Sequence, residues 1–136
     1  MGVRLERGFV AIEWVAAIAM LLFPAVALVA SLPTWAERKH AAVVAAREAA
    51  RDLQRDWPAG DVAGAELVAK YVAADHGVAP SAVTVRVLDV GANPGDQIRV
   101  EVRVAMPAIA VPGVQDINAW TYTTTATLRV DDYRSR

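Results

Sequence analysis

Glu13 is the residue whose type and position most limit what this chain can do. It is the only charge in an apolar run from Phe9 to Leu32. An ionised carboxylate costs about 2.5 to 3.5 kcal/mol at the centre of a membrane-spanning helix, and less near its end. Glu13 lies about one helical turn inside the start of the run. Its carboxylate therefore either reaches up to the lipid headgroups or is neutralised by a positive group from another subunit.

Residues suited to catalysis or metal binding are few. The chain has no cysteine and only two histidines, His40 and His76, too few for a histidine-based zinc site unless carboxylates join them. Asp75, His76 and Ser81 lie close in sequence, but a catalytic triad depends on spatial roles, and no nucleophile elbow or phosphate-binding loop accompanies them. We therefore expect no enzyme activity, no catalytic residue, no metal and no cofactor.

Charge and cysteine content narrow the class of protein further. The net charge is −1, and binding to nucleic acid would require a clustered excess of lysine and arginine. We therefore expect no nucleic-acid partner. Because cysteine is absent, the folded part of the chain must be held by packing without disulfides.

The apolar run has the length of a membrane span. Its roughly 24 residues, at about 1.5 Å each, form a helix of roughly 36 Å, enough to cross a hydrocarbon core of about 30 Å with some tilt. The sequence therefore predicts one transmembrane helix over residues 9–33, and the lipid membrane is the first expected partner. Pro24 lies in the middle of this span and is expected to kink the helix or loosen one turn, because it removes a backbone hydrogen bond.

The residues around Glu13 resemble the prepilin motif of type IV pilin-like proteins. A short basic leader ends at Arg7-Gly8, Phe9 follows, and the glutamate is the fifth residue counted from Phe9. A small C-terminal domain ending in Asp132-Tyr133-Arg134 makes the chain most similar to TadE-family pseudopilins of tight-adherence pili. The resemblance covers Arg7 to about Leu53 well and the remainder only in general layout.

The resemblance implies a processing pathway. A prepilin peptidase would cut between Gly8 and Phe9, removing the leader of residues 1–8, and Phe9 would become an N-methylated N-terminus. Glu13 would place the subunit against a neighbour, and its carboxylate would offset the charge of the new amine. Other pilin and pseudopilin subunits and the pilus assembly machinery are then the expected partners. The leader would face the cytoplasm and the C-terminal domain would lie outside.

Two features depart from the major pilins of this family, and two alternatives stay open. Trp14 stands where the major pilins have a tyrosine, and the chain is longer than they are, so both features favour a minor subunit. One alternative is an uncleaved single-pass anchor carrying an extracytoplasmic binding module. The other is a secretory signal peptide, with Arg4 and Arg7 as its basic region, although Glu13 would weaken its apolar segment.

Beyond the span, the helical period continues over residues 34–57, which indicates an amphipathic continuation of the same helix. One stripe is mostly alanine, and the charged pair Glu48 and Arg51 lies mainly elsewhere. Pro58 and Gly60 end this helix, and Asp61 is expected to cap a second one that runs to about Asp75.

After Pro80 the period changes to alternation, which predicts three strands. Their inward residues are expected to be Val83, Val85 and Val87, then Ile98, Val100, Val102 and Val104, then Trp120, Tyr122, Thr124, Ala126, Leu128 and Val130. The segment from Gly91 to Asp96 is expected to form a hairpin turn, because its asparagine, proline and glycines supply the required backbone angles.

Two surface features of the domain have either a binding role or a purely structural one. Four threonines alternate along the third strand, and they either bind sugars or surfaces or simply form a solvated strand face: Thr121, Thr123, Thr125 and Thr127. The apolar loop from Pro107 to Asn118 is either a contact surface or an ordinary connection.

Together these expectations describe an α+β protein with a single membrane span. A long N-terminal helix, transmembrane and then amphipathic, leads to a short second helix and a small three-stranded antiparallel sheet. The expected divisions are the leader at 1–8, the span at 9–33, the amphipathic continuation at 34–57 and an extracytoplasmic domain at 58–136.

Overall fold

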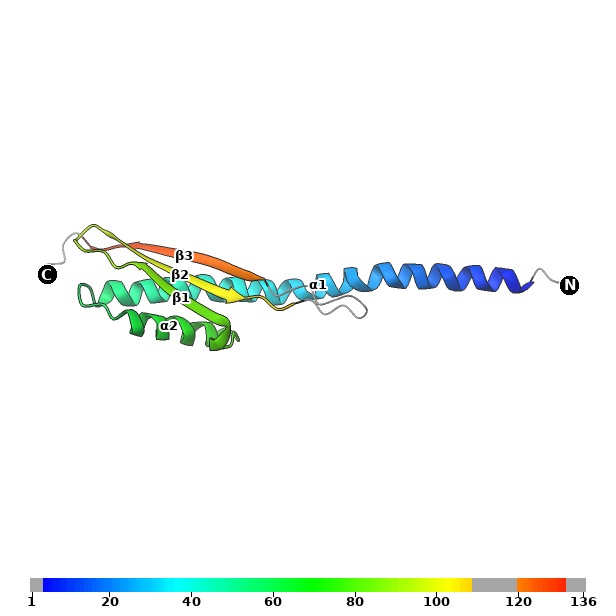
Figure 1. The fold of residues 1–136 in the computed structure, drawn as a ribbon, viewed down its shortest axis with the longest axis horizontal. Helices are drawn as coiled ribbons and strands as arrows, with labels where there is room; N and C mark the ends of the chain where they lie inside the picture. The colour runs from blue at the N-terminus through cyan, green and yellow to red at the C-terminus, as the bar shows by residue number, and fades with distance from the viewer. Residues whose placement is uncertain (1–3, 109–119, 132–136) are drawn as a thin grey trace. The chain divides into compact units, whose positions relative to one another are not determined.

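The fold is α+β, as the sequence predicts. The computed structural model describes residues 4–108 and 120–131, with residues 4–9 described by their backbone alone. In chain order the elements are α1 (Arg4–Arg55), α2 (Val62–Asp75), the short 3-10 helix η1 (Pro80–Ala82), β1 (Val83–Asp89), β2 (Gln97–Ala105) and β3 (Thr121–Arg129) (Figure 1). The expected loop from Pro107 to Asn118 lies mostly outside the described residues, and the terminal Asp132-Tyr133-Arg134 lies wholly outside them.

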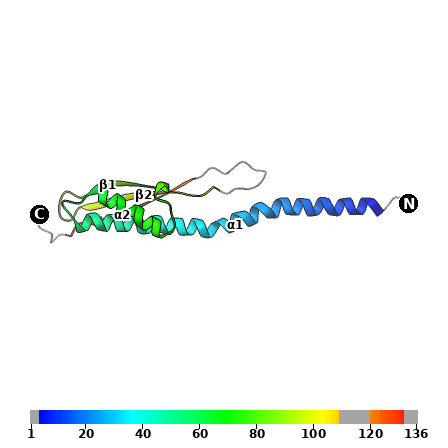
Figure 2. The same ribbon diagram turned by 90° about the horizontal axis from the view of Figure 1, so that it is seen from below.

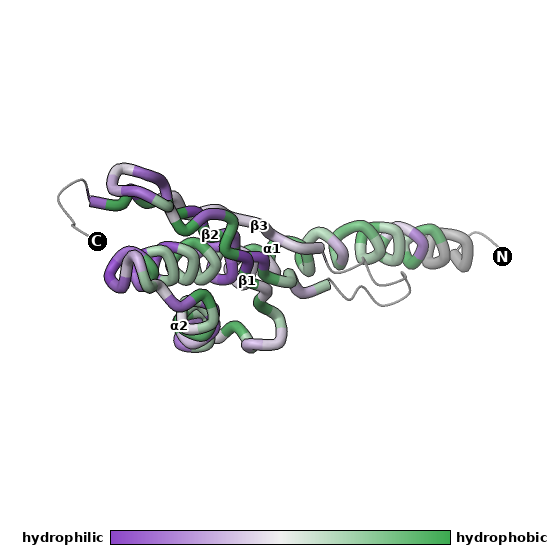
Figure 3. The backbone as a smooth tube through the Cα atoms, turned by 60° about the vertical axis from the view of Figure 1, so that its left-hand side comes forward, coloured by the Kyte–Doolittle hydropathy of each residue, from purple (hydrophilic) through white to green (hydrophobic). Residues whose placement is uncertain are grey.

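The chain divides into two units, and α1 contributes to both. The first comprises Met1–Pro33 and Ala108–Ile117, and the second comprises Thr34–Pro107 and Asn118–Arg136. In the first unit α1 is long and apolar enough to cross a membrane. Figure 3 shows hydrophobic residues along most of this part of α1. Pro24 and Pro33 both lie inside the helix, and the expected bend at Pro24 stays a prediction.

The second unit contains an antiparallel sheet in the order β1-β2-β3. The register pairs Val85 with Val102 and Val102 with Thr124, so equivalent positions of the three strands share a face. The expected alternation is confirmed within the strands, because Val100 and Val102 are fully buried while the threonines at 121, 123, 125 and 127 are exposed. The prediction for Trp120 is wrong, because this residue precedes β3 and is 44% exposed. The register between β1 and β2 shifts between Val87 and Asp89.

The inner face of the sheet shares one apolar core with α1 and α2. Figures 1 and 2 both place the sheet and α2 alongside the C-terminal half of α1. The helices contribute almost only alanines, all at most 1% exposed: Ala41, Ala42, Ala45, Ala46, Ala49 and Ala50 from α1, and Ala65, Ala69 and Ala73 from α2. Small side chains allow close approach of the backbones, and larger buried side chains come from β2, at Ile98, Val100, Val102 and Val104.

The ends of the helices follow from local chemistry. Asp61 caps α2 as predicted, because its side chain accepts a hydrogen bond from the Ala63 N–H. The predicted end of α1 at Trp57 is two residues too late, since the helix ends at Arg55. The residue before a proline disfavours helical geometry, and Trp57 leaves the helix to donate its Nε1–H to the Gly91 carbonyl over 2.9 Å.

Candidate functional site

The apolar part of α1 is the largest candidate contact surface. Its large side chains are about half exposed or more from Val10 to Leu32, with Met20 and Leu21 at 82% and 79%. Soluble monomers rarely expose contiguous apolar patches of more than a few hundred Å². This surface therefore requires a lipid or protein environment.

Glu13 lies on this surface and is itself exposed. Within the described residues no basic side chain forms an ion pair with it. The predicted cleavage site, Gly8 and Phe9, lies in α1, where the structure describes the backbone but not the side chains. As expected from the sequence, the Glu13 carboxylate therefore still needs either a lipid headgroup or a positive group from another subunit.

An aromatic-cationic cluster forms where the second unit begins, and we define it as Trp35, Lys39, Trp120 and Tyr122. The rings of Trp35 and Trp120 meet edge to face with centroids 6.1 Å apart, and the Lys39 Nζ lies 5.2 Å from the centre of the Tyr122 ring. Tryptophan, tyrosine and lysine are favoured at the boundary between hydrocarbon and water.

Trp120 was expected on the inward face of the third strand, but its contact with Trp35 was not predicted. The positions of the two residues could have suggested the contact, because Trp35 starts the amphipathic stretch and Trp120 immediately precedes the third strand. Arg38 fixes the same region by donating from Nη1 to the Ala105 carbonyl over 2.6 Å. The Trp35 Nε1 is buried and has no hydrogen-bond partner among the described residues.

The two histidines, which are far apart in sequence, touch one another. His40 on α1 and His76 after α2 meet edge to face with ring centroids 5.5 Å apart. In residues 4–108 and 120–131 no three histidine, aspartate or glutamate side chains are grouped so that they could hold a metal ion. No hydrogen bond joins Asp75, His76 and Ser81 within the same residues. The pair is a helix contact without an evident chemical role.

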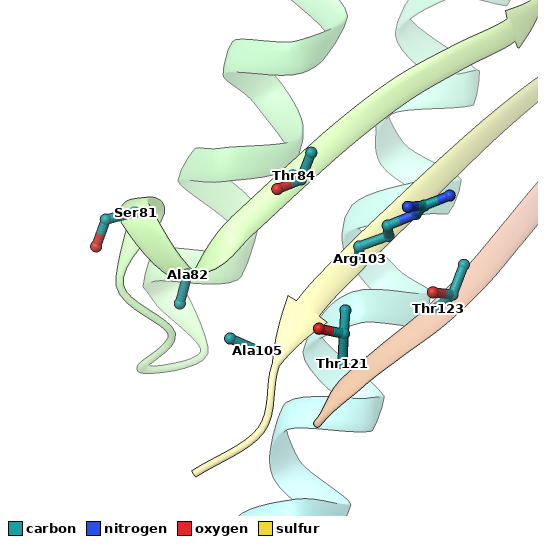
Figure 4. A pocket seen from close by; sticks show the side chains of 7 residues that line it. All are labelled: Ser81, Ala82, Thr84, Arg103, Ala105, Thr121 and Thr123. Atoms are coloured by element: carbon teal, nitrogen blue, oxygen red, sulfur yellow. The ribbon is translucent and has the colours of Figure 1, made fainter. Parts of the chain in front are cut away.

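The outer face of the sheet carries a hydroxyl-lined pocket of about 380 Å³. Figure 4 shows its polar lining, Ser81, Thr84, Thr121 and Thr123, together with Arg103. Arg103 donates to the Glu101 carboxylate over 2.8 Å, so its charge is already paired. This pocket offers hydroxyl groups and no net charge.

A second groove, of about 330 Å³, has a different charge. It lies between α1 and β3 and is lined by Arg47, Arg51 and residues 125–128. Arg51 pairs with Glu48, as predicted from their spacing, whereas no ion pair involves Arg47 in the described part of the chain. The groove thus carries one uncompensated positive charge beside the last strand.

Comparison of the chain with protein-family models, with curated proteins and with solved structures finds no match in any of the three.

Proposed function

We propose that this chain is a minor pseudopilin-like subunit that assembles into a tight-adherence type IV pilus. The observation that carries the proposal is the combination on α1 of a Gly8-Phe9 junction, a glutamate at the fifth position from Phe9, and an exposed apolar surface that continues to Leu32. The same helix then contributes its alanine face to a small folded domain. A subunit built in this way anchors in the membrane and presents its domain outside it.

The mechanism begins with processing. A prepilin peptidase cuts the peptide bond between Gly8 and Phe9, and the new amine of Phe9 is left at or near the hydrocarbon boundary. The Glu13 carboxylate offsets that positive charge through a charge-assisted hydrogen bond, either within the subunit or across to a neighbour. Such a pair fixes the axial position of one helix against another, because a displaced carboxylate would be left unpaired in an apolar environment.

The protein in this proposal has a structural role and no enzyme activity. Its partners are the prepilin peptidase, other pilin and pseudopilin subunits, and the pilus assembly machinery. It resides in the cytoplasmic membrane as a single-pass protein, with the N-terminus in the cytoplasm and the C-terminal domain outside, before it enters the cell-surface pilus.

A second candidate is an uncleaved anchor that carries an extracytoplasmic binding module. The hydroxyl-lined pocket favours this alternative, because Thr121 and Thr123 offer polar groups to a ligand without any filament. The anchor would then serve only to hold the domain at the membrane surface.

The mature N-terminus decides between the two candidates. We would measure it by intact-protein and N-terminal peptide mass spectrometry on the full chain from native membranes, with and without the prepilin peptidase. A methylated Phe9 that depends on the peptidase supports the pseudopilin. A retained Met1, or Gly2 after methionine removal, supports the anchor. Signal peptidase could cut after the small residues Ala27 or Ala30, and the resulting start at Leu28 or Ser31 would overturn both candidates in favour of a secreted domain.

A further inference from the structure

The outer edge of β3 presents a regular row of backbone hydrogen-bonding groups. Met106 N–H donates to the Trp120 carbonyl and Val130 N–H donates to the Asp96 carbonyl, each over 2.8 Å. In an antiparallel pair, hydrogen-bonded and non-hydrogen-bonded positions alternate. The even-numbered residues of β3 therefore bond to β2, and the N–H and C=O groups of residues 121, 123, 125, 127 and 129 point away from the sheet.

One bond confirms this direction independently. Gln54 of α1 donates its side-chain amide to the Arg129 carbonyl over 2.7 Å, which is possible because that carbonyl points outward. Among the described residues, no hydrogen bond is made to the outward backbone groups of residues 121, 123, 125 and 127.

The two edges of the sheet differ in how well they are protected. β1 carries Arg86, has a register shift between Val87 and Asp89, and contacts α2. Charges, irregular register and covering helices are the features that keep an edge strand from pairing. The stretch from Thr121 to Leu128 has no charge, no proline and no irregularity in its pairing with β2. It is the edge that can accept another strand.

The groove beside this edge determines which charge a bound segment should carry. Arg47 and Arg51 come from α1 and line the groove together with Thr125 and Thr127. Glu48 compensates Arg51, and Arg47 remains uncompensated within the described residues. A partner segment that paired with β3 would lie next to these guanidinium groups. Acidic side chains are therefore favoured on the part of the segment that faces the groove.

We propose that the edge of β3 binds an extended acidic segment of a partner protein as a fourth, added strand. Backbone hydrogen bonds to residues 121, 123, 125 and 127 hold the segment, and the guanidinium of Arg47, uncompensated among the described residues, selects its carboxylates. The inference does not rest on the pilus proposal, because it needs neither cleavage nor a filament. Either protein, anchor or pilus subunit, would capture its partner in this way.

The test uses the full-length chain in detergent micelles and three synthetic nine-residue peptides. The first alternates valine and glutamate, the second alternates valine and lysine, and the third is the acidic peptide with alternate amides N-methylated, which removes donors that a strand needs. Binding is followed by NMR titration, and amide hydrogen exchange is measured for β3. We expect only the unmethylated acidic peptide to bind, slowing exchange at residues 121, 123, 125 and 127.

Matched variants locate the interaction. Arg47→Gln should weaken binding of the acidic peptide about two- to five-fold, as the loss of an exposed ion pair does, whereas Arg86→Gln at the other edge should leave it unchanged. Thr125→Pro removes an outward N–H while leaving the hydrogen bonds to β2 in place. It should abolish the slowing of amide exchange in β3 that the acidic peptide causes.

Several results would overturn the proposal. Equal binding of the lysine peptide would contradict the claim that the partner is acidic. Binding that survives N-methylation, or slowed amide exchange confined to other elements, would contradict the claim that the partner adds a strand. Failure of the acidic peptide to bind would contradict both claims. Because the peptides themselves provide the backbone control, the conclusion stands even where Thr125→Pro lowers stability.

Discussion

Trp57 joins the end of one helix to a hairpin that begins 34 residues later in the chain. Its indole is 6% exposed and donates to the Gly91 carbonyl. Gly91 has a φ of 72°, and a Cβ placed on it would come within 3.0 Å of the Val130 side chain. The positive φ and the close Val130 side chain both favour glycine at the position whose carbonyl accepts the bond from Trp57.

Trp57→Phe tests this contact. Phenylalanine keeps an aromatic ring but cannot donate to the Gly91 carbonyl, so we expect a loss of about 1 to 3 kcal/mol in the free energy of unfolding. Urea unfolding of the full-length chain in micelles, followed by near-ultraviolet circular dichroism, measures it. Tyr71→Phe, at a side chain that is 66% exposed, is the control and should change little. Equal stability of the two variants would contradict the role given to Trp57.

Glu13 is the residue on which the assembly proposal makes its sharpest prediction. Glu13→Ala leaves the Gly8-Phe9 junction intact, so processing should continue, but the register-setting carboxylate is lost and incorporation into filaments should fall. Quantitative mass spectrometry of sheared pili and of membranes measures both quantities. Glu37→Ala removes an exposed carboxylate from the same helix in the second unit and should leave incorporation unchanged. Normal piliation in the Glu13 variant would count against the proposed role.

At the scale of elements, the contact between α1, α2 and the sheet depends on small side chains. Nine alanines of the two helices are at most 1% exposed. Each buries little area by itself, so packing is favourable because the backbones come close and the valines of β2 fill the space between them. A larger side chain in this layer must displace one element from another.

Ala69→Leu tests this packing against Ala74→Leu on the same helix. Ala69 is fully buried in the core, whereas Ala74 is exposed, and both residues have high helix propensity before and after the change. We expect the buried substitution to cost about 1 to 3 kcal/mol through overpacking and the exposed one to cost less than about 0.5 kcal/mol. Thermal unfolding of the full-length chain in micelles, compared at equal protein concentration, measures the difference. Similar melting temperatures would show that α2 is not held against the core.

The elements also show which parts of the structure can be predicted from sequence. The alternation around Val100 and the cap at Asp61 are local patterns, so the strands and α2 were predicted close to their observed bounds. The contact between Trp35 and Trp120 and the bond from Trp57 to Gly91 depend on how distant segments meet, which no local period encodes. In the candidate site, the role of Glu13 was inferred from its surroundings in sequence and stays a prediction. The charge of the groove could not be inferred, because Arg47 approaches Thr127 only through packing.

At the scale of the whole molecule, the chain has two environments to satisfy. The first part of α1 exposes its apolar side chains, whereas the second part buries its alanine face in the folded domain. The fold thus needs a membrane or another subunit for the first part and needs neither for the core of the second.

Leu22→Lys tests that requirement. Leu22 is 58% exposed near the middle of the apolar run, where a lysine costs about 2.5 to 3.5 kcal/mol in membrane insertion. We expect the variant to shift from the membrane fraction toward the carbonate-extractable or degraded fraction, measured by immunoblotting after sodium carbonate extraction. Leu67→Lys on α2 is the matched control, because Leu67 is 53% exposed and lies in the second unit, so its partition should not change. Unaltered extraction resistance in both variants would mean that a protein surface, and not lipid, covers this part of α1.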